Sequence, residues 1–135
     1  MASKRARSQK TDARHFRLYH SMADTKAWAS LTCAQRCVYL ALALRLNGFN
    51  NGSIGISVRE AALAANCNKD TAARALRTLC ERGFIERMKE GAFNYKIRHS
   101  ALYRLTHLPV EHGNFQMPPT FEFRSWRPGK NTGTT

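Results

Sequence analysis

Two helix-start signals follow one another in the middle of the chain and restrict what it can fold into. Ser57 and Glu60 have capping-box spacing, in which the serine hydroxyl accepts from the third helical amide and the glutamate reaches back to the serine amide. Asn68 is a second N-cap candidate, because its side-chain oxygen can satisfy a free backbone N–H. The stretch therefore predicts a short helix beginning at Val58, a turn, and a second helix over residues 69–82.

The second predicted helix has two chemically different faces. Apolar residues recur at spacings of three and four and form a stripe for the core: Ala72, Ala75, Leu76 and Leu79. Cations, hydroxyls and small side chains occupy the rest of the surface: Lys69, Asp70, Thr71, Ala73, Arg74, Arg77 and Thr78. Gly83 is expected to be a left-handed C-cap, after which Phe84 begins a strand. The N-terminal end of this helix can thus enter a DNA major groove without steric obstruction.

These residues carry a resemblance. The pattern Thr71-Ala72-x-Arg74-Ala75-Leu76-x-x-Leu79-x-x-x-Gly83-x-Ile85 resembles the recognition helix and following strand of GntR-type and related bacterial winged-helix regulators. The resemblance as a whole covers roughly residues 32–106. A wider likeness is to small winged-helix proteins of bacterial chromosomes, plasmids and prophages, through Ala27-Trp28, Asn50-Asn51-Gly52, Gly91-Ala92-Phe93 and Tyr103-Arg104-Leu105-Thr106. The resemblance implies a mainly α fold with a small antiparallel β-wing (α+β), a winged helix-turn-helix.

The charge balance points to a polyanionic partner. The 135 residues carry 22 Lys and Arg against 9 Asp and Glu, a formal net charge of +13. Both the first 17 residues and the predicted folded part have an excess of cations, so a basic tail alone does not explain the total. Nucleic acid is the first candidate, and no apolar run is long enough for a membrane span.

The chain divides into three predicted regions. Residues 1–14 form a basic arm that is expected to be disordered when unbound. Residues 15–107 form the winged helix-turn-helix domain with an N-terminal extension, and residues 108–135 form a partly ordered tail. The arm either contacts phosphates or a minor groove, or is a solvated tail that aids solubility. Its candidate DNA contacts are Lys4, Arg5, Arg7 and Lys10.

A scaffold of further elements is expected before the central stretch. Thr32 and Gln35 repeat the capping-box spacing, and they predict a buried helix, apolar nearly all round, that continues to about Leu46. Residues 25–30 predict a short helix, and residues 53–56 a short first strand. The aromatic segment before the main helix is expected to pack on the core, although its residues Tyr19 and Trp28 would also suit a dimer contact. Asn50 and Asn51 fit a tight turn, with DNA-backbone contact as the alternative.

After the central stretch, residues 84–89 and 100–106 predict two antiparallel strands. Tyr103 and its neighbours alternate as in a strand with one buried face. The hairpin between these strands is the expected wing, whose cations can neutralise phosphates or enter a minor groove. A charged hairpin is also what solubility requires. The candidate wing contacts are Lys89, Asn94, Tyr95, Lys96, Arg98 and His99.

Other chemistry finds little support in the sequence. The cysteines at 33, 37, 67 and 80 are interpreted as small core hydrophobes, with a metal held by Cys33, Cys37 and a histidine as the alternative. No convergent acid–base pair, metal-ligand spacing or Gly-rich phosphate loop is present, so we expect no enzyme activity, metal or cofactor. The tail aromatics Phe121, Phe123 and Trp126 either pack on the domain or form a partner contact.

The leading hypothesis is a sequence-specific double-stranded-DNA-binding protein, most simply a cytoplasmic, nucleoid-associated transcriptional regulator. Base readout is assigned to Lys69, Asp70, Thr71, Ala73, Arg74 and Arg77, and phosphate contact to Ser57, Arg59, Asn68 and Thr78. The alternatives are a replication or recombination accessory factor of a plasmid or phage, and a winged-helix protein-interaction module. Homodimerisation is left open, and neither a membrane nor a small-molecule effector is implied.

Overall fold

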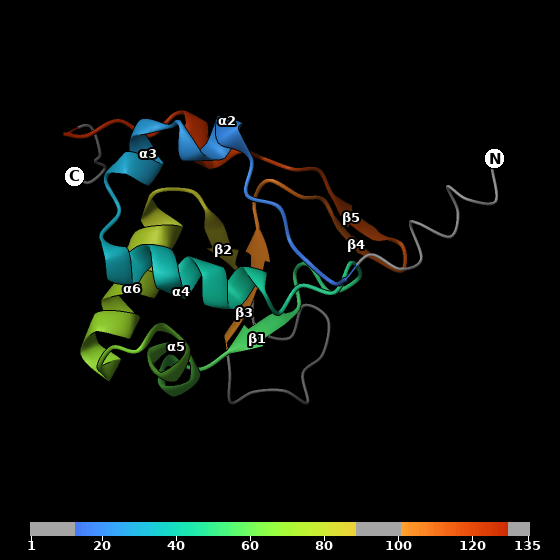
Figure 1. Ribbon diagram of the computed structural model, residues 1–135. Coiled ribbons are helices and arrows are strands. Elements are labelled where there is room, and N and C mark those ends of the chain that lie inside the picture. Colours follow the sequence, from blue (N-terminus) through green and yellow to red (C-terminus); the bar gives the residue numbers. More distant parts are fainter. Residues whose placement is uncertain (1–12, 89–100, 130–135) are drawn as a thin grey trace.

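The protein has an α+β fold with a small antiparallel sheet (Figure 1). The computed structural model describes residues 13–88 and 101–129. The candidate arm contacts (Lys4, Arg5, Arg7, Lys10) and wing contacts (Lys89, Asn94, Tyr95, Lys96, Arg98, His99) lie outside these residues and stay predictions. In chain order, the described elements are α2 (His20–Ala23), α3 (Lys26–Ala29), α4 (Cys33–Ala43), β1 (Ile54–Ile56), α5 (Val58–Ala65), α6 (Lys69–Glu81), β2 (Ile85–Arg87), β3 (Ala101–Leu105), β4 (Val110–His112), β5 (Phe115–Met117) and the 3-10 helix η1 (Glu122–Arg124).

Local capping fixes the starts of the three longer helices as the sequence predicts. Both capping boxes form, with Thr32 and Gln35 at α4 and Ser57 and Glu60 at α5. Asn68 Oδ1 accepts from the Thr71 amide at 2.8 Å at the start of α6. These bonds satisfy amides that a helix cannot pair internally, which is why short sequence signals locate them well.

Helix α4 departs from prediction in its length and burial. It ends at Ala43 rather than near Leu46, and a turn follows. It also is not buried all round: Cys33 and Cys37 are exposed, and Leu44 just beyond it is 65% exposed. The physical reason is that α5 and α6 pack on α4 and leave its opposite side to solvent. The interpretation of Cys33 and Cys37 as core residues is therefore wrong.

The sheet joins strands that lie far apart in the chain. Its order is β1-β3-β2, with both pairings antiparallel, Ile54 opposite Tyr103 and Ile85 opposite Leu105. Gly83, at φ +87°, makes the sharp change from α6 to this sheet, as its C-cap position predicts. The sheet thus ties the segment after α6 to the segment before α5.

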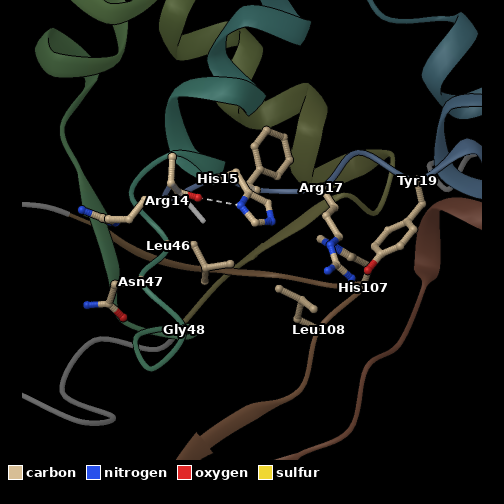
Figure 2. Close-up of a pocket in the computed structure, with 11 residues that line it drawn as sticks. Arg14, His15, Arg17, Tyr19, Leu46, Asn47, Gly48, His107 and Leu108 are labelled. Carbon is tan, nitrogen blue, oxygen red and sulfur yellow. Dashed lines mark hydrogen bonds between the residues drawn. The ribbon is translucent and has the colours of Figure 1, made fainter. Parts of the chain in front are cut away.

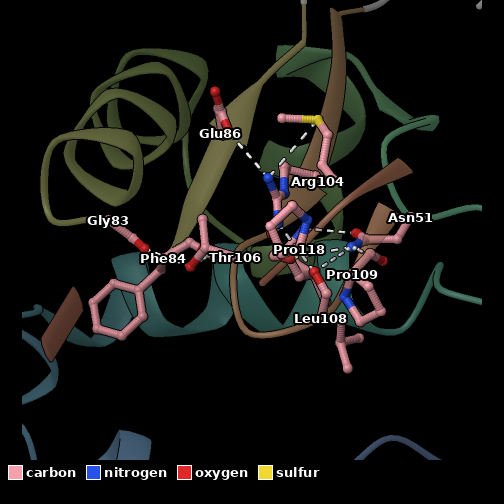
Figure 3. A network of polar contacts seen from close by, with 11 residues as sticks. Asn51, Gly83, Phe84, Glu86, Arg104, Thr106, Leu108, Pro109 and Pro118 are labelled. Atoms are coloured by element: carbon pink, nitrogen blue, oxygen red, sulfur yellow. Dashed lines mark hydrogen bonds and ion pairs between the residues drawn. The ribbon is translucent and has the colours of Figure 1, made fainter. Parts of the chain in front are cut away.

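The second strand of the predicted hairpin, β3, is buried on both faces, which contradicts the expected one-sided burial. Arg104 on its second face and Thr106, the residue just after the strand, are fully buried. The Arg104 guanidinium donates to the carbonyls of Leu108 at 3.1 Å and Pro118 at 2.9 Å (Figure 3). Thr106 Oγ1 donates to the Gly83 carbonyl at 2.6 Å. The C-terminal segment covers this face and gives partners to the Thr106 hydroxyl and the terminal guanidinium nitrogens of Arg104, whereas the buried Arg104 Nε has none among the described residues.

Of the two roles that the sequence left open for the tail aromatics, the structure shows packing on the domain. The Phe123 ring stacks on Phe84 at a centroid distance of 5.1 Å. Trp28 and Tyr39 meet Phe84 edge-on at 5.6 and 6.0 Å. The expectation that the N-terminal aromatic segment packs on the core is confirmed for Trp28. In Figure 1, α2, α3 and the red η1 segment accordingly gather at one end of the molecule.

Candidate nucleic-acid interface

Helix α6 presents the predicted division between a buried and an exposed side. Its stripe Ala72, Ala75, Leu76 and Leu79 is buried, with at most 5% exposure. Lys69, Asp70, Arg74 and Arg77 are exposed, and Thr71, Ala73 and Thr78 are half-buried. The apolar stripe therefore holds the helix against the core, which leaves the candidate base-reading residues on the outside.

The N-terminus of α6 adds unpaired backbone donors to this side. The Asn68 side chain satisfies the Thr71 amide, and the first intrahelical bond runs from Ala72 N to Asn68 O at 3.0 Å. The amides of Lys69 and Asp70 precede that bond, so they remain as donors at the positive end of the helix dipole. Such an end favours an anion, and a phosphate oxygen is one.

The N-terminus of α5 forms the capping box that the sequence predicts, and Arg45 joins it. The Ser57 oxygen accepts from the Glu60 amide at 3.1 Å, and Glu60 Oε1 accepts from Ser57 N at 2.9 Å. Arg45 lies 3.6 Å from Glu60 and donates to the Gly55 carbonyl at 2.7 Å. The hydrogen bond from the Ser57 backbone, and then the Arg45 charge, lower the pKa of Glu60. Ser57 keeps only its hydroxyl proton for a phosphate, whereas Arg59 is exposed.

A groove of about 410 Å³ separates α6 from the sheet. Ala73 and Arg77 line it from α6, Val58 from α5, and Arg87 and Tyr103 from the strands. Arg87 is exposed and is the last residue of β2, so it extends the basic side of α6 toward the sheet. The sequence analysis missed it. A cation where a strand meets the expected wing was the available signal.

One polar group that the sequence left as a possible DNA contact, Asn51, has another role, and the possible ion pair of Asp70 does not form. Asn51 is 9% exposed and bonds to β3 and the loop after it, so the tight-turn interpretation fits and the DNA-backbone alternative does not. Asp70 forms no ion pair with Arg74 or Arg77 among the described residues, so both guanidinium groups remain available. The candidate surface therefore carries four cations, Lys69, Arg74, Arg77 and Arg87, against two acids, Asp70 near the N-terminus of α6 and Glu81 in the groove.

Other chemistry is not assembled in the described part of the chain. Residues 13–88 and 101–129 contain no group of three or more His, Cys, Asp or Glu side chains that could hold a metal ion. Burial raises the pKa of the Cys80 thiol, which keeps it protonated and unreactive. None of the described helices is both long and apolar enough to cross a bilayer.

Comparisons with protein-family models, with curated proteins and with solved structures gave no match.

Proposed function

We propose that this protein is a sequence-specific double-stranded-DNA-binding protein that acts as a transcriptional regulator through a winged helix-turn-helix. Helix α6 enters the major groove, and the wing, residues 89–99, contacts the flanking backbone or minor groove. The observation that carries the proposal is the exposed N-terminal side of α6, where Lys69 and Arg74 lie near backbone amides that have no partner in the helix. The opposite side of α6 is buried in the core.

The order of the elements supports this proposal. A helix (α4), a strand (β1), two helices joined by a short turn (α5 and α6) and two antiparallel strands (β2 and β3) follow one another. The winged-helix interpretation of the sequence requires this order. The turn before α6 uses Asn66 at φ +56°, a conformation that asparagine tolerates.

The exposed side chains of α6 suit base readout. Arg74 or Lys69 contacts guanine O6 and N7, and such a bidentate contact contributes about 1–3 kcal/mol of discrimination. Arg77 lies about one turn further along and meets either a base edge or a phosphate. Thr71 and Ala73 are small enough to let the helix backbone approach the bases.

Candidate phosphate contacts accompany this helix. They are the free amides at the start of α6, the Asn68 side chain, Arg59 of α5, and Arg87, which lines the groove with Arg77. Phosphate contacts set the orientation on the duplex and make the affinity fall with salt.

The test is a double variant, Arg74→Ala with Arg77→Ala, titrated with a duplex selected from genomic fragments. Loss of the two contacts is expected to weaken specific binding by about 30-fold or more. Both side chains are exposed, so the free energy of unfolding should change by less than about 0.5 kcal/mol.

The matched control is Lys26→Ala with Arg127→Ala, which removes the same charge from exposed sites outside α5 and α6. It should retain most of the affinity for the selected duplex. Equal affinity of the α6 variant and the parent, or equal losses in both double variants, would contradict the proposed placement of α6.

A further inference from the structure

A second basic site lies away from α6. A pocket of about 410 Å³ forms between residues 13–19, the loop after α4 and the segment after β3 (Figure 2). None of the residues that line it belongs to α5, α6 or the turn between them. In Figure 1, the blue N-terminal segment runs on the side of the molecule that bears β4 and β5, well apart from the α5–α6 turn.

The pocket has cations on its walls and no acid. Arg14 and Arg17 line it, both are exposed, and neither forms an ion pair within the described residues. They come from one extended segment, in which the His15 ring nitrogen Nδ1 bonds to the Ala13 carbonyl at 2.9 Å. With no carboxylate among the lining residues, the pocket favours an anion.

Aromatic and apolar groups form the rest of the pocket. The Tyr19 and His107 rings meet edge-on at 6.1 Å, and Tyr19 is 45% exposed. Burial lowers the pKa of His107, so this ring is neutral near pH 7 and adds no charge to the pocket. Leu46 and Leu108 add apolar surface, as Figure 2 shows. A flat ring system can therefore lie against Tyr19 beside this apolar surface.

We propose that this pocket binds a single nucleotide unit, with the base against Tyr19 and Leu108, the phosphate on Arg17, and Arg14 adding positive charge from the other end of the pocket. A volume of about 410 Å³ admits one such unit. Base stacking on an aromatic side chain beside cations is the general chemistry by which proteins hold unpaired nucleotides. The same chemistry serves a free mononucleotide or an unpaired nucleotide of a single strand, and the site does not depend on the proposed role of α6.

The experiment uses the full chain carrying Arg74→Ala and Arg77→Ala, which removes the α6 surface as a competing site. Calorimetric titrations compare dAMP, adenosine and inorganic phosphate. The proposal predicts that dAMP binds at least about tenfold more tightly than either fragment. Adding Arg14→Ala and Arg17→Ala, or Tyr19→Ala, should weaken dAMP binding by about tenfold or more, whereas adding Lys26→Ala and Arg127→Ala should not.

A single-stranded (dA)8 oligonucleotide distinguishes the two sources. If it displaces dAMP and binds more tightly, the occupant is a nucleotide within a strand; if dAMP alone binds, the occupant is a free nucleotide. Binding of dAMP no tighter than that of phosphate, or equal losses with the Arg14/Arg17 and Lys26/Arg127 substitutions, would overturn the proposal. Because Arg14 and Arg17 are exposed, their replacement should leave the urea-unfolding midpoint unchanged, and this control separates a loss of binding from a folding defect.

Discussion

The side chain of Asn51 pairs with the backbone of Leu105 in both directions. The Leu105 amide donates to Asn51 Oδ1 at 2.7 Å, and Asn51 Nδ2 donates back to the Leu105 carbonyl at 3.1 Å. The same Nδ2 group also lies 3.2 and 3.1 Å from the carbonyls of Leu108 and Pro109. One buried side chain therefore fixes the loop before β1 to the end of β3.

Replacing Asn51 by leucine should lower the free energy of unfolding by about 3 kcal/mol. The substitution leaves a buried amide and carbonyls unpaired, and each such group costs about 1–3 kcal/mol. The control is Asn50→Ala, whose lost bonds to Asn47 and Arg45 lie in an exposed turn where water can replace them. Urea denaturation measures both, and equal losses would contradict the bridging role of Asn51.

Gly83 and Gly48 form a matched pair for a test of close packing. Both have positive φ, so alanine at either position adds about 1–2 kcal/mol of backbone strain. A Cβ on Gly83 would lie 2.7 Å from backbone atoms of Glu122 and Phe123, whereas a Cβ on Gly48 meets nothing within 4 Å. Gly83→Ala should therefore cost about 1–3 kcal/mol more than Gly48→Ala in thermal or urea unfolding. Equal costs would mean that the C-terminal segment does not pack against this turn.

The stacked pair Phe84 and Phe123 predicts that the C-terminal segment stabilises the whole fold. Phe123 is 2% exposed, and Phe123→Ala should cost about 3–5 kcal/mol. Phe49 is 87% exposed, so Phe49→Ala, the same chemical change at the surface, should cost less than about 0.5 kcal/mol. Guanidinium denaturation compares them. An unchanged midpoint in Phe123→Ala would show that the tail is an appendage.

The charge of Glu60 should make part of the stability pH-dependent. Its pKa is lowered in the folded protein from the ordinary value of 4.5, so the carboxylate stabilises the fold at pH values above 4.5. That contribution is lost as the pH falls through the folded-state pKa. In Glu60→Gln the amide can still cap Ser57 but carries no charge. The difference in the free energy of unfolding between parent and variant should be largest near neutral pH and shrink toward pH 3. A difference independent of pH would contradict a stabilising role for the Glu60 charge.

Signals that act within four residues were predictable from the sequence. The capping boxes at Thr32 and Ser57, the cap at Asn68 and the left-handed Gly83 all involve neighbours in the chain, and all are found where they were expected. The buried stripe of α6 was equally predictable from the sequence, because its four apolar residues recur at the spacings of three and four that place side chains on one face of a helix. The exposed side of α6, and hence the accessibility of its candidate contacts, follows from that stripe.

Features that depend on distant segments were not predictable in the same way. Arg104 looked like a surface residue of an alternating strand, but the segment around Leu108 and Pro118 covers it. The exposure of Cys33 and Cys37 depends on which side of α4 meets α5 and α6. The β4–β5 hairpin did leave a local signal that was overlooked, since Gly113 and Asn114 between two short runs suit a two-residue turn.

The most direct test of DNA recognition is a selection of fragments from the source genome by the purified protein. The enriched duplex and a scrambled duplex are then titrated at about 0.15 M salt. Sequence-specific recognition predicts a preference of about a thousandfold or more for the enriched duplex, and sites at promoters predict a regulator. Equal, steeply salt-dependent binding to both duplexes, or no binding at all, would contradict it.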